Sequence, residues 1–430
     1  MPEQVTVDAV VIGAGAGGLA AATRLSSRGY RVLVVETEER LGGRASSREI
    51  DGFVLNTGAL ALERDGPVAA LYRDLGLTLD LHVPYPDTVL LLGRRALPAS
   101  TGPAGRIRHL LPRGLRLLTR TAPRLRPQPG ESTGTWLRRL TRSTIVHGLI
   151  DNVCGAFFAA SSDDLPAAVF LTFMAEGSGF KNLGFVPGGT AEVWEPLAEH
   201  VRTRGGQVWT SSTVQHLTVD DGRVVRATVD RAGVTTTVHA DVFVSNIGPL
   251  HTIKLTEPGA LPSAYVDDIA GRPAGGAILT VHFASPVPLV AWPGVALAAR
   301  SRRMTYALNC SDPALGRVRR LGWCLYSASS TPRPATGDFD EETEKELLLA
   351  DVRDHFPGFD EHAVILHWDV AAHEQPAQRA IAGFDLPVDT PARNLWNVGD
   401  GVKPWGEAGT AACLRSADIA VDHIIGNTRP

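Results

Sequence analysis

Three glycines and one carboxylate near the N-terminus have the types and spacing that bind a nucleotide diphosphate. Gly13, Gly15 and Gly18 follow one apolar run, and Glu36 ends the next apolar run. A pyrophosphate reaches the backbone N–H groups at a helix N-terminus only where no side chain stands in the way. Gly13 therefore permits the tight turn, Gly15 lets the phosphate approach, and Gly18 lets the helix pack closely on its strand. Glu36 is placed to accept hydrogen bonds from the adenosine ribose, and its charge would repel a 2′-phosphate, which disfavours NADP.

These residues belong to the elements of a βαβ unit. The apolar residues 10–12 predict a buried parallel strand, residues 20–27 predict a helix, and residues 32–35 predict a second strand. Gly17 lies in the same glycine-rich turn. A GxGxxG pattern alone is weak in a chain with 44 glycines, but here strand, glycines, helix, strand and acid follow in order. We therefore predict a dinucleotide-binding βαβ unit rather than a glycine-rich loop without a ligand.

A second glycine pair follows, where a simple NAD-binding domain would begin its next helix. Gly42 and Gly43 lie between Arg40 and Arg44. Two glycines beside two arginines make a flexible loop with cationic donors, suited to closing over the diphosphate and ribityl chain of a longer cofactor. FAD is such a cofactor, and we prefer it to NAD.

This stretch resembles the Arg-x-Gly-Gly-Arg signature of the flavin amine oxidase and phytoene desaturase superfamily. Residues 51–53, together with Asn56, Thr57 and Gly58, look like the flavin-proximal turn that follows the signature in that family. The resemblance implies that both stretches contact FAD. Residues 186–190 are similar to the Pro-Gly-Gly turn by which these proteins return to the cofactor domain.

The resemblance extends to two more distant segments. Val214 matches a valine that packs against the adenine or hydrogen-bonds it through the backbone. Residues 394–400 resemble the strand whose final Gly399-Asp400 pair holds the ribityl and phosphate groups.

The last helix also has an expected role. It opens within residues 406–412, and the resemblance assigns Gly409, Thr410 and Ala411 to its N-terminus. The free N–H groups there would face the pyrimidine end of the flavin and stabilise its negative charge when the flavin is reduced.

The positions of these signatures predict the architecture. We expect an α/β fold with a Rossmann-like FAD-binding domain that is discontinuous, formed by residues 1–60, 186–250 and 392–430. Residues 61–185 and 251–391 would form an interleaved α+β substrate domain of mixed sheet plus helices. Apolar periodicity predicts its strands and helices as follows: strands at residues 277–283, 295–299, 304–308 and 323–327, and helices at 135–158, 165–175 and 339–356.

Composition restricts the class of protein. With 430 residues, 44% of them apolar, the chain can bury a large core. Its net charge of −4 predicts no general affinity for nucleic acid. We find no apolar stretch of ~18 residues and no room for a signal peptide before the first strand, so we expect a cytoplasmic protein. The four cysteines form no CxxC pair, so we predict neither a metal site nor a disulfide framework. The sequence leaves the oligomeric state open.

One segment, from Gly105 to Arg126, is unusually basic. It contains seven arginines and no acidic residue, interleaved with isoleucine and leucine at intervals of three and four. A basic amphipathic pattern of this kind is typical of helices that lie on anionic lipid. Because Pro112 and Pro123 would shorten the helix, we favour an arginine-rich cap over the substrate domain and keep peripheral membrane contact as the alternative.

Candidates for acid–base chemistry are few. In monoamine and polyamine oxidases a lysine near the flavin lies on a strand that resembles residues 277–283, and here Thr280 matches it. This departure disfavours amine oxidation, whereas dehydrogenation of carbon mainly requires a dry, apolar channel that orients the substrate. If a proton must move, His373 and Glu374 in a predicted loop are the candidates, and Arg379 could anchor a carboxylate instead.

Three functions therefore remain open. We favour an FAD-dependent desaturase or oxidase that removes a hydride from an apolar, polyene or isoprenoid-like, secondary metabolite, with an amine or amino-acid oxidase as a variant. The second is a redox-neutral polyene cis-trans isomerase that uses reduced FAD. The third is a flavin-binding protein whose main contact is a partner protein. Since the chain looks shorter than typical phytoene desaturases, we expect a substrate smaller than a full-length carotenoid.

Overall fold

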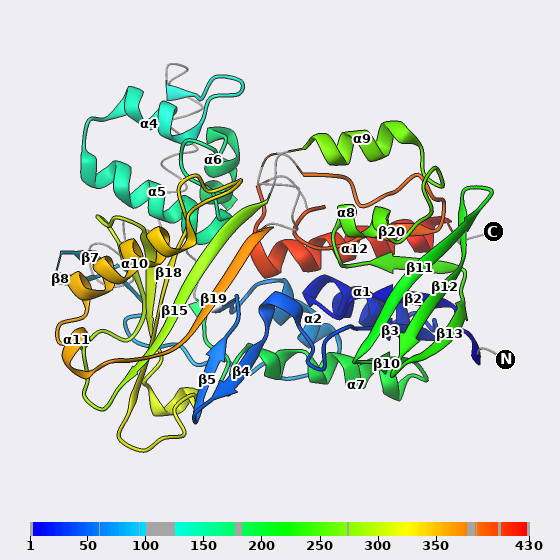
Figure 1. The fold of residues 1–430 in the computed structure, drawn as a ribbon, viewed down its shortest axis with the longest axis horizontal. Coiled ribbons are helices and arrows are strands. Elements are labelled where there is room, and N and C mark those ends of the chain that lie inside the picture. Colours follow the sequence, from blue (N-terminus) through cyan, green and yellow to red (C-terminus); the bar gives the residue numbers. More distant parts are fainter. Residues whose placement is uncertain are drawn as a thin grey trace.

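A five-stranded parallel sheet joins the two ends of the chain to its middle (Figure 1). Its strand order is β10-β3-β2-β14-β20, with the following bounds: β2 Ala9–Ile12, β3 Val32–Val35, β10 Gln207–Trp209, β14 Val242–Ser245 and β20 Leu395–Asn397. Every residue of β2, β3, β14 and β20 is buried. Continuous apolar strands of this kind are expected where both faces of a parallel sheet are covered. The computed structural model describes residues 3–59, 61–93, 95–99, 125–176, 183–272, 275–375, 383, 385–402 and 406–427.

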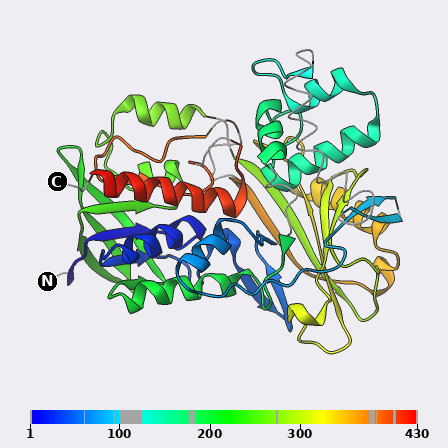
Figure 2. The same cartoon turned by 180° about the vertical axis from the view of Figure 1, so that it is seen from behind.

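Helices cover one face of this sheet. They are α1 (Ala16–Ser27), α7 (Glu195–Thr203) and α12 (Gly409–Asn427), and α2 (Pro67–Asp74) flanks them. Val11 and Val34 of the sheet belong to the same buried cluster as leucines of α1, α7 and α12. Seen from behind, α1 and α12 run side by side (Figure 2).

A four-stranded sheet covers the other face, with β1 parallel to β13 and the other neighbouring strands antiparallel. Its strand order is β1-β13-β12-β11, with the following bounds: β1 Glu3–Thr6, β11 Ser212–Asp220, β12 Arg223–Arg231 and β13 Val234–His239. Val10 and Leu33, which alternate with the helix-facing residues of the parallel sheet, pack against its apolar side chains. The cofactor half of the molecule thus has three layers: helices, the parallel sheet and the four-stranded mixed sheet.

A seven-stranded sheet forms the core of the other half (Figure 1). Its order is β19-β15-β18-β17-β16-β7-β8, with the following bounds: β7 Thr88–Leu92, β8 Arg95–Pro98, β15 Gly276–Ser285, β16 Gly294–Ala298, β17 Met304–Asn309, β18 Cys324–Ser330 and β19 Val364–Gln375. Its strand pairs are antiparallel except β16 with β7. The amphipathic α10 (Glu341–His355) covers one face of this sheet, over a cluster that includes Phe283 and Tyr326.

Three helices lie at one end of the seven-stranded sheet. They are α4 (Thr133–Leu140), α5 (Thr144–Phe158) and α6 (Ala167–Glu176). Phe158 and Phe173 bring α5 and α6 together, with ring centroids 4.8 Å apart. Shorter elements complete the described structure: strands β4 Ser47–Ile50, β5 Phe53–Asn56, β6 Leu62–Glu63 and β9 Leu183–Gly184, and helices α8 Pro249–Lys254, α9 Ser263–Gly271 and α11 Phe359–His362.

The predicted α/β fold is confirmed, and two of the finer predictions are wrong. Residues 135–158 form two helices rather than one, because the chain leaves the helix after Leu140 and Ser143 caps α5 by accepting a hydrogen bond from the N–H of Val146. His373 and Glu374, expected in a loop, belong to β19, which pairs with β15.

The four boundaries that divide the chain into two domains stay a prediction. The basic segment Gly105 to Arg126 lies outside the described residues except for its last two. No helix in the described part of the chain is long and apolar enough to cross a membrane.

Candidate active site

A cavity of about 770 Å³ takes its lining from both the parallel sheet and the seven-stranded sheet. Its position at the carboxyl ends of β2, β3 and β14 is where open α/β sheets bind their ligands. The cavity brings together most of the residues that the sequence singled out: Gly13, Gly15, Glu36, Gly42, Gly43, Arg44, Thr57, Gly58, Val214, Gly399, Asp400, Gly409, Thr410 and Ala411.

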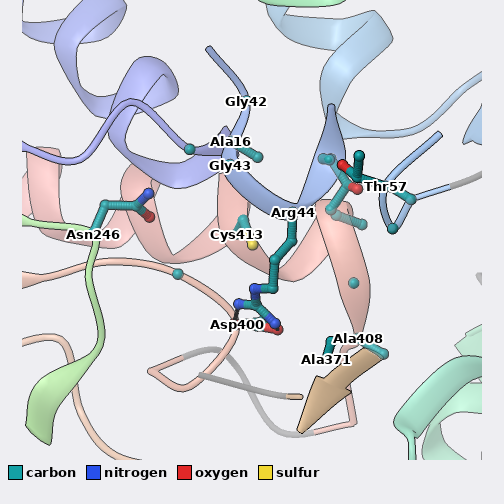
Figure 3. A pocket seen from close by; sticks show the side chains of 18 of the residues that line it. Ala16, Gly42, Gly43, Arg44, Thr57, Asn246, Ala371, Asp400, Ala408 and Cys413 are labelled. Carbon is teal, nitrogen blue, oxygen red and sulfur yellow. Dashed lines mark hydrogen bonds and ion pairs between the residues drawn. The ribbon is translucent and has the colours of Figure 1, made fainter. Parts of the chain in front are cut away.

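The glycine-rich turn leaves no room for side chains. Gly13 has a φ of +91°, and a Cβ at Gly18 would lie 2.0 Å from the carbonyl oxygen of Gly13. A Cβ at Gly15 would lie 2.5 Å from Nδ2 of Asn246, whose side chain lies beside the turn (Figure 3). Gly15 caps α1 without a side-chain hydrogen bond. The first N–H groups of α1 therefore have no side-chain cap and suit an anion.

Glu36 is held rigidly at the adenosine end. Its carboxylate is 8% exposed and accepts hydrogen bonds from the N–H of Ala14 at 2.6 Å and the N–H of Glu38 at 2.9 Å. Each carboxylate oxygen keeps a further lone pair, so Glu36 can still accept from a ribose hydroxyl in the cavity that it lines.

An ion pair joins the second glycine pair to the C-terminal return. Figure 3 shows Arg44 reaching from the turn at Gly43 to Asp400. The guanidinium makes two parallel hydrogen bonds to the carboxylate, of 2.8 and 3.2 Å, and Asp400 is 5% exposed. A Cβ at Gly42 would lie 2.2 Å from the Trp194 ring. Glycine is therefore needed there for packing as well as for the positive φ of +94°.

The start of α12 is tied to the same place. Gly409, Thr410 and Ala411 begin α12 and line the cavity. The buried hydroxyl of Ser416 accepts a hydrogen bond of 2.8 Å from the N–H of Gly399 and donates to the carbonyl of Cys413 at 2.7 Å. Ser416 thus fixes the Gly399-Asp400 turn that follows β20 against the helix.

Four predicted cofactor residues do not line the cavity. Gly17 and Gly18 lie in the first turn of α1, and Arg40 is half-buried outside the cavity. Asn56 accepts a hydrogen bond from the N–H of Thr190 at 3.2 Å and donates to the carbonyl of Ala59 at 3.3 Å. Asn56 therefore positions the turn that carries Thr57 and Gly58, and its direct contact with the cofactor stays a prediction.

The predicted acid–base pair gains no support from the geometry. His373 and Glu374 lie on β19 rather than in a loop, and their side chains, like all of Arg379, are outside the described structure. Their catalytic role stays a prediction.

Beyond the cofactor end, the cavity is mainly apolar. Helices α5 and α6 and strands β9, β15, β16 and β17 contribute these side chains: Ala156, Phe157, Phe158, Phe173, Leu183, Ile278, Val295, Leu297 and Leu308. Tyr306 is also in the lining, and its burial raises the pKa of the phenol to about 12. Thr280 lines the cavity as well, with its hydroxyl 2.8 Å from that of Ser329.

The sequence analysis assigned no role to Asn246 and Asp369, two polar residues of the lining. Asn246 directly follows β14, so the rule that ligands bind at the carboxyl ends of parallel strands could have found it. Asp369 lies on β19, where it forms an ion pair with Arg48 and accepts from Nε2 of His282 at 3.0 Å. Nothing in the local sequence around Asp369 indicates these partners.

The pKa values in this cluster follow from burial and pairing. Burial lowers the pKa of His282, and the hydrogen bond to Asp369 only partly opposes this effect. Desolvation alone would raise the pKa of Asp369, but the hydrogen bond from His282 and the positive charges around it outweigh desolvation and leave that pKa below its ordinary value. At neutral pH Asp369 is therefore a carboxylate and His282 a neutral imidazole.

Comparison with known proteins gives one consistent result. Residues 16–422 match the family of flavin-containing amine oxidoreductases. A putative flavin-containing monoamine oxidase of Mycobacterium tuberculosis, AofH, is 26% identical over 294 residues, which cover 60% of this chain and 61% of AofH. The match therefore spans less than two thirds of that relative.

Two further proteins extend the comparison. The neurosporene-forming phytoene desaturase of Rhodobacter capsulatus is 44% identical over 75 residues, 17% of this chain and 14% of that protein. The crystal structure of an oxidoreductase from Methanosarcina mazei superposes with a TM-score of 0.81 at 24% identity, covering 96% of this chain and 100% of that chain. This structural likeness shows that the fold is shared.

The fold and the cavity define a flavoprotein with its nucleotide site on a Rossmann-like sheet and a second sheet over the cavity. The chain belongs to the flavin-containing amine oxidoreductase family. The residues present fit FAD, because the glycine-rich turn admits a diphosphate, Glu36 can meet a ribose, and the cavity continues from there to the N-terminus of α12.

Proposed function

We propose that this oxidoreductase removes a hydride from a predominantly apolar, isoprenoid-like or polyene-like metabolite, as a desaturase or oxidase. The apolar lining contributed by α5, α6 and strands β15 to β17 is the observation that carries this proposal. Burying an alkyl chain against such side chains contributes about 25 cal/mol for each Å² removed from water. A polar substrate would instead lose its hydration without compensating hydrogen bonds.

Some residues of the cavity would bind the cofactor, and others would orient the substrate and exclude water. Bound FAD supplies the acceptor for two electrons. Glu36 and the turn at Gly13 to Gly18 would hold the adenosine and diphosphate, and the N-terminus of α12 would stabilise negative charge at the far end of the cofactor. Phe157, Leu297 and Leu308 would then orient the substrate and keep water away from the carbon that loses hydride.

Thr280 supports carbon dehydrogenation over amine oxidation. Its hydroxyl, bonded to Ser329, occupies the position that matches a lysine in the monoamine and polyamine oxidases. The short match to a phytoene desaturase is consistent with carbon dehydrogenation. The longer match to AofH keeps amine oxidation as the alternative to test.

Anaerobic reduction of the bound flavin tests the proposal. The FAD-loaded protein is mixed without oxygen with isoprenoid alkenes, with alkyl amines and with amino acids, and the loss of visible flavin absorbance is followed. We expect bleaching by the apolar substrates only. Bleaching by amines alone would overturn the proposal in favour of amine oxidation. If only pre-reduced enzyme converted one polyene isomer into another, and the flavin stayed reduced, the protein would be an isomerase instead.

A matched pair of variants tests the apolar lining. Val295→Thr keeps the shape of the half-buried side chain but places a hydroxyl in the cavity, and we expect affinity for the apolar substrate to fall about fivefold or more. Val219→Thr makes the same change on β11, outside the cavity lining, and should leave that affinity unchanged. Equal affinities for the two variants would contradict the assignment of this lining to the substrate.

A further inference from the structure

The cavity side of the seven-stranded sheet is divided into an apolar and a polar part. Strands β16 and β17 carry the apolar part, including Val295, Leu297 and Leu308. Strands β15, β18 and β19 carry a hydrogen-bonded set that we call the polar corner: Thr280, His282, Ser327, Ser329 and Asp369. Side chains that alternate with these, such as Val281 and Tyr326, pack on the opposite face beneath α10. Polar side chains are therefore concentrated on β15, β18 and β19, and the phenol of Tyr306 on β17 hydrogen-bonds with Ser329 of this set.

A chain of hydrogen bonds fixes the orientation of Asp369. Its Oδ2 accepts from Nε2 of His282 at 3.0 Å, and Nδ1 of His282 lies 2.7 Å from the hydroxyl of Ser327. Since the imidazole is neutral and its Nε2 carries the proton, Nδ1 must accept, and Ser327 donates to it. His282 is 1% exposed. These hydrogen bonds therefore hold Asp369 in place from the protein interior and do not themselves face the cavity.

Asp369 keeps the capacity to accept another hydrogen bond in the cavity. It lines the cavity, whereas Arg48, His282 and Ser327 do not. A carboxylate has about four lone-pair positions. Arg48 and His282 occupy two of these, and Nε2 of His367 approaches Oδ1 at a longer distance of 3.5 Å. At least one position remains for a donor that enters the cavity.

The charge of Asp369 is already balanced. Arg48 reaches it from the β4–β5 hairpin, and the two side chains are 35% and 16% exposed. An ammonium group brought to Asp369 would be attracted by the carboxylate and repelled by the nearby guanidinium, while losing its own hydration. A neutral O–H or N–H group has a much smaller desolvation cost and still gains a hydrogen bond to a charged acceptor.

We propose that Asp369 selects substrates that carry one neutral hydrogen-bond donor, a hydroxyl or an uncharged N–H group, on an otherwise apolar body. This inference rests on the proposed function, because it assigns a residue to the substrate of the same cavity. In the register of β15 and β19, Asp369 stands directly opposite Thr280. The carboxylate therefore faces the substrate from the strand next to the one that carries lysine in the amine oxidases.

Three probes with one carbon skeleton separate these contributions. Decanol can donate a hydrogen bond, decyl methyl ether cannot, and decylammonium adds a positive charge. Their affinities for the FAD-loaded protein are measured by isothermal titration calorimetry. We expect the wild type to bind decanol roughly tenfold to a hundredfold more tightly than the ether, as one hydrogen bond to a charged group allows. We also expect no preference for decylammonium over decanol.

Two variants and a control assign the preference to named side chains. Asp369→Asn should abolish the difference between decanol and the ether. Arg48→Met should leave Asp369 uncompensated and shift the preference toward decylammonium by roughly tenfold or more. Asp354→Asn removes a carboxylate from an exposed ion pair with Arg302 and should change neither ratio. Retention of FAD by each variant shows that the cofactor site has folded.

Each result has a definite meaning. Equal binding of decanol and the ether by the wild type would overturn the role of Asp369, as would tighter binding of decylammonium. If Asp369→Asn fails to retain FAD, the test depends on Arg48→Met. An unchanged preference between decanol and decylammonium in that variant would then refute the inference. Failure of all three probes to bind would instead refute the apolar substrate itself, so the two proposals fail in different ways.

Discussion

The tightest contact in the glycine-rich turn is at Gly18, where the first turn of α1 passes the end of β2. A Cβ built there lies 2.0 Å from the carbonyl oxygen of Gly13 and 3.1 Å from Cβ of Asn246. Relieving the first contact requires a backbone movement on the order of 1 Å, because well-packed carbon atoms stay about 3.5 Å or more from their neighbours. We therefore expect Gly18→Ala to lower the free energy of unfolding by about 2 to 3 kcal/mol, at the upper end of overpacking costs.

The same displacement should weaken cofactor binding. It moves the N–H groups of α1 away from the diphosphate, and loss of one hydrogen bond to a charged group corresponds to about 1.5 to 3 kcal/mol, or at least a tenfold weaker affinity for FAD. The assays are thermal unfolding and the ratio of FAD to protein after gel filtration.

A matched glycine in α9 provides the control. Gly271 lies at the end of a helix, and a Cβ there meets nothing within 4 Å. Gly271→Ala should leave FAD binding unchanged and add up to about 1 kcal/mol of stability. If Gly18→Ala retained FAD and unfolded at the same temperature as this control, the close approach of α1 to β2 would not be what requires glycine.

Three further predictions concern ionisable groups. Glu36→Gln should weaken FAD binding about tenfold in a fluorescence titration, because a neutral amide replaces the charged acceptor, and an unchanged affinity would remove Glu36 from the ribose contact. Asp400→Asn should reduce FAD retention more than Arg44→Met does, since Asp400 is almost fully buried and Arg44 can be replaced in part by solvent; the reverse order would mean that Arg44 is the direct cofactor ligand. Because burial lowers the pKa of His282, stability should be full above its unfolded-state pKa of about 6.5 and fall as the pH drops below that value. Chemical denaturation at several pH values should show that the free energy of unfolding declines less steeply with falling pH in His282→Gln than in the wild type. Parallel curves for the two proteins would contradict this origin of the acid sensitivity.

The cofactor half of the site could be predicted from the sequence because its motifs are short stretches of neighbouring residues. Gly13 and Gly18 lie in one turn, and a Cβ at Gly18 would lie closest to the carbonyl oxygen of Gly13 rather than to a group distant in sequence. Val214 and Asp400 were found through a resemblance that covers short motifs. The fold joins these motifs because each lies in, or within a few residues of, a strand of the parallel sheet or of the sheet that covers it.

The substrate half of the site could not be predicted from the sequence in the same way. Asp369 acquires its role from the pairing of β15 with β19 and from Arg48, which is distant in sequence. A pattern of alternating residues predicts a strand but not its register with another strand, and a shift of one residue would turn Asp369 away from the cavity. The adjacent His373 and Glu374 were predicted as an acid–base pair in a loop, whereas both lie on β19.

The two halves of the site consequently differ in how easily they can change. The cofactor half binds through backbone N–H groups, close glycine contacts and helix N-termini, so most substitutions there damage FAD binding. The seven-stranded sheet presents side chains from several strands to the same cavity, and Thr280 or Asp369 can be replaced without altering the backbone that holds the cofactor. Substrate preference in this protein should therefore respond to single substitutions on β15 and β19, while the capacity to hold FAD should not.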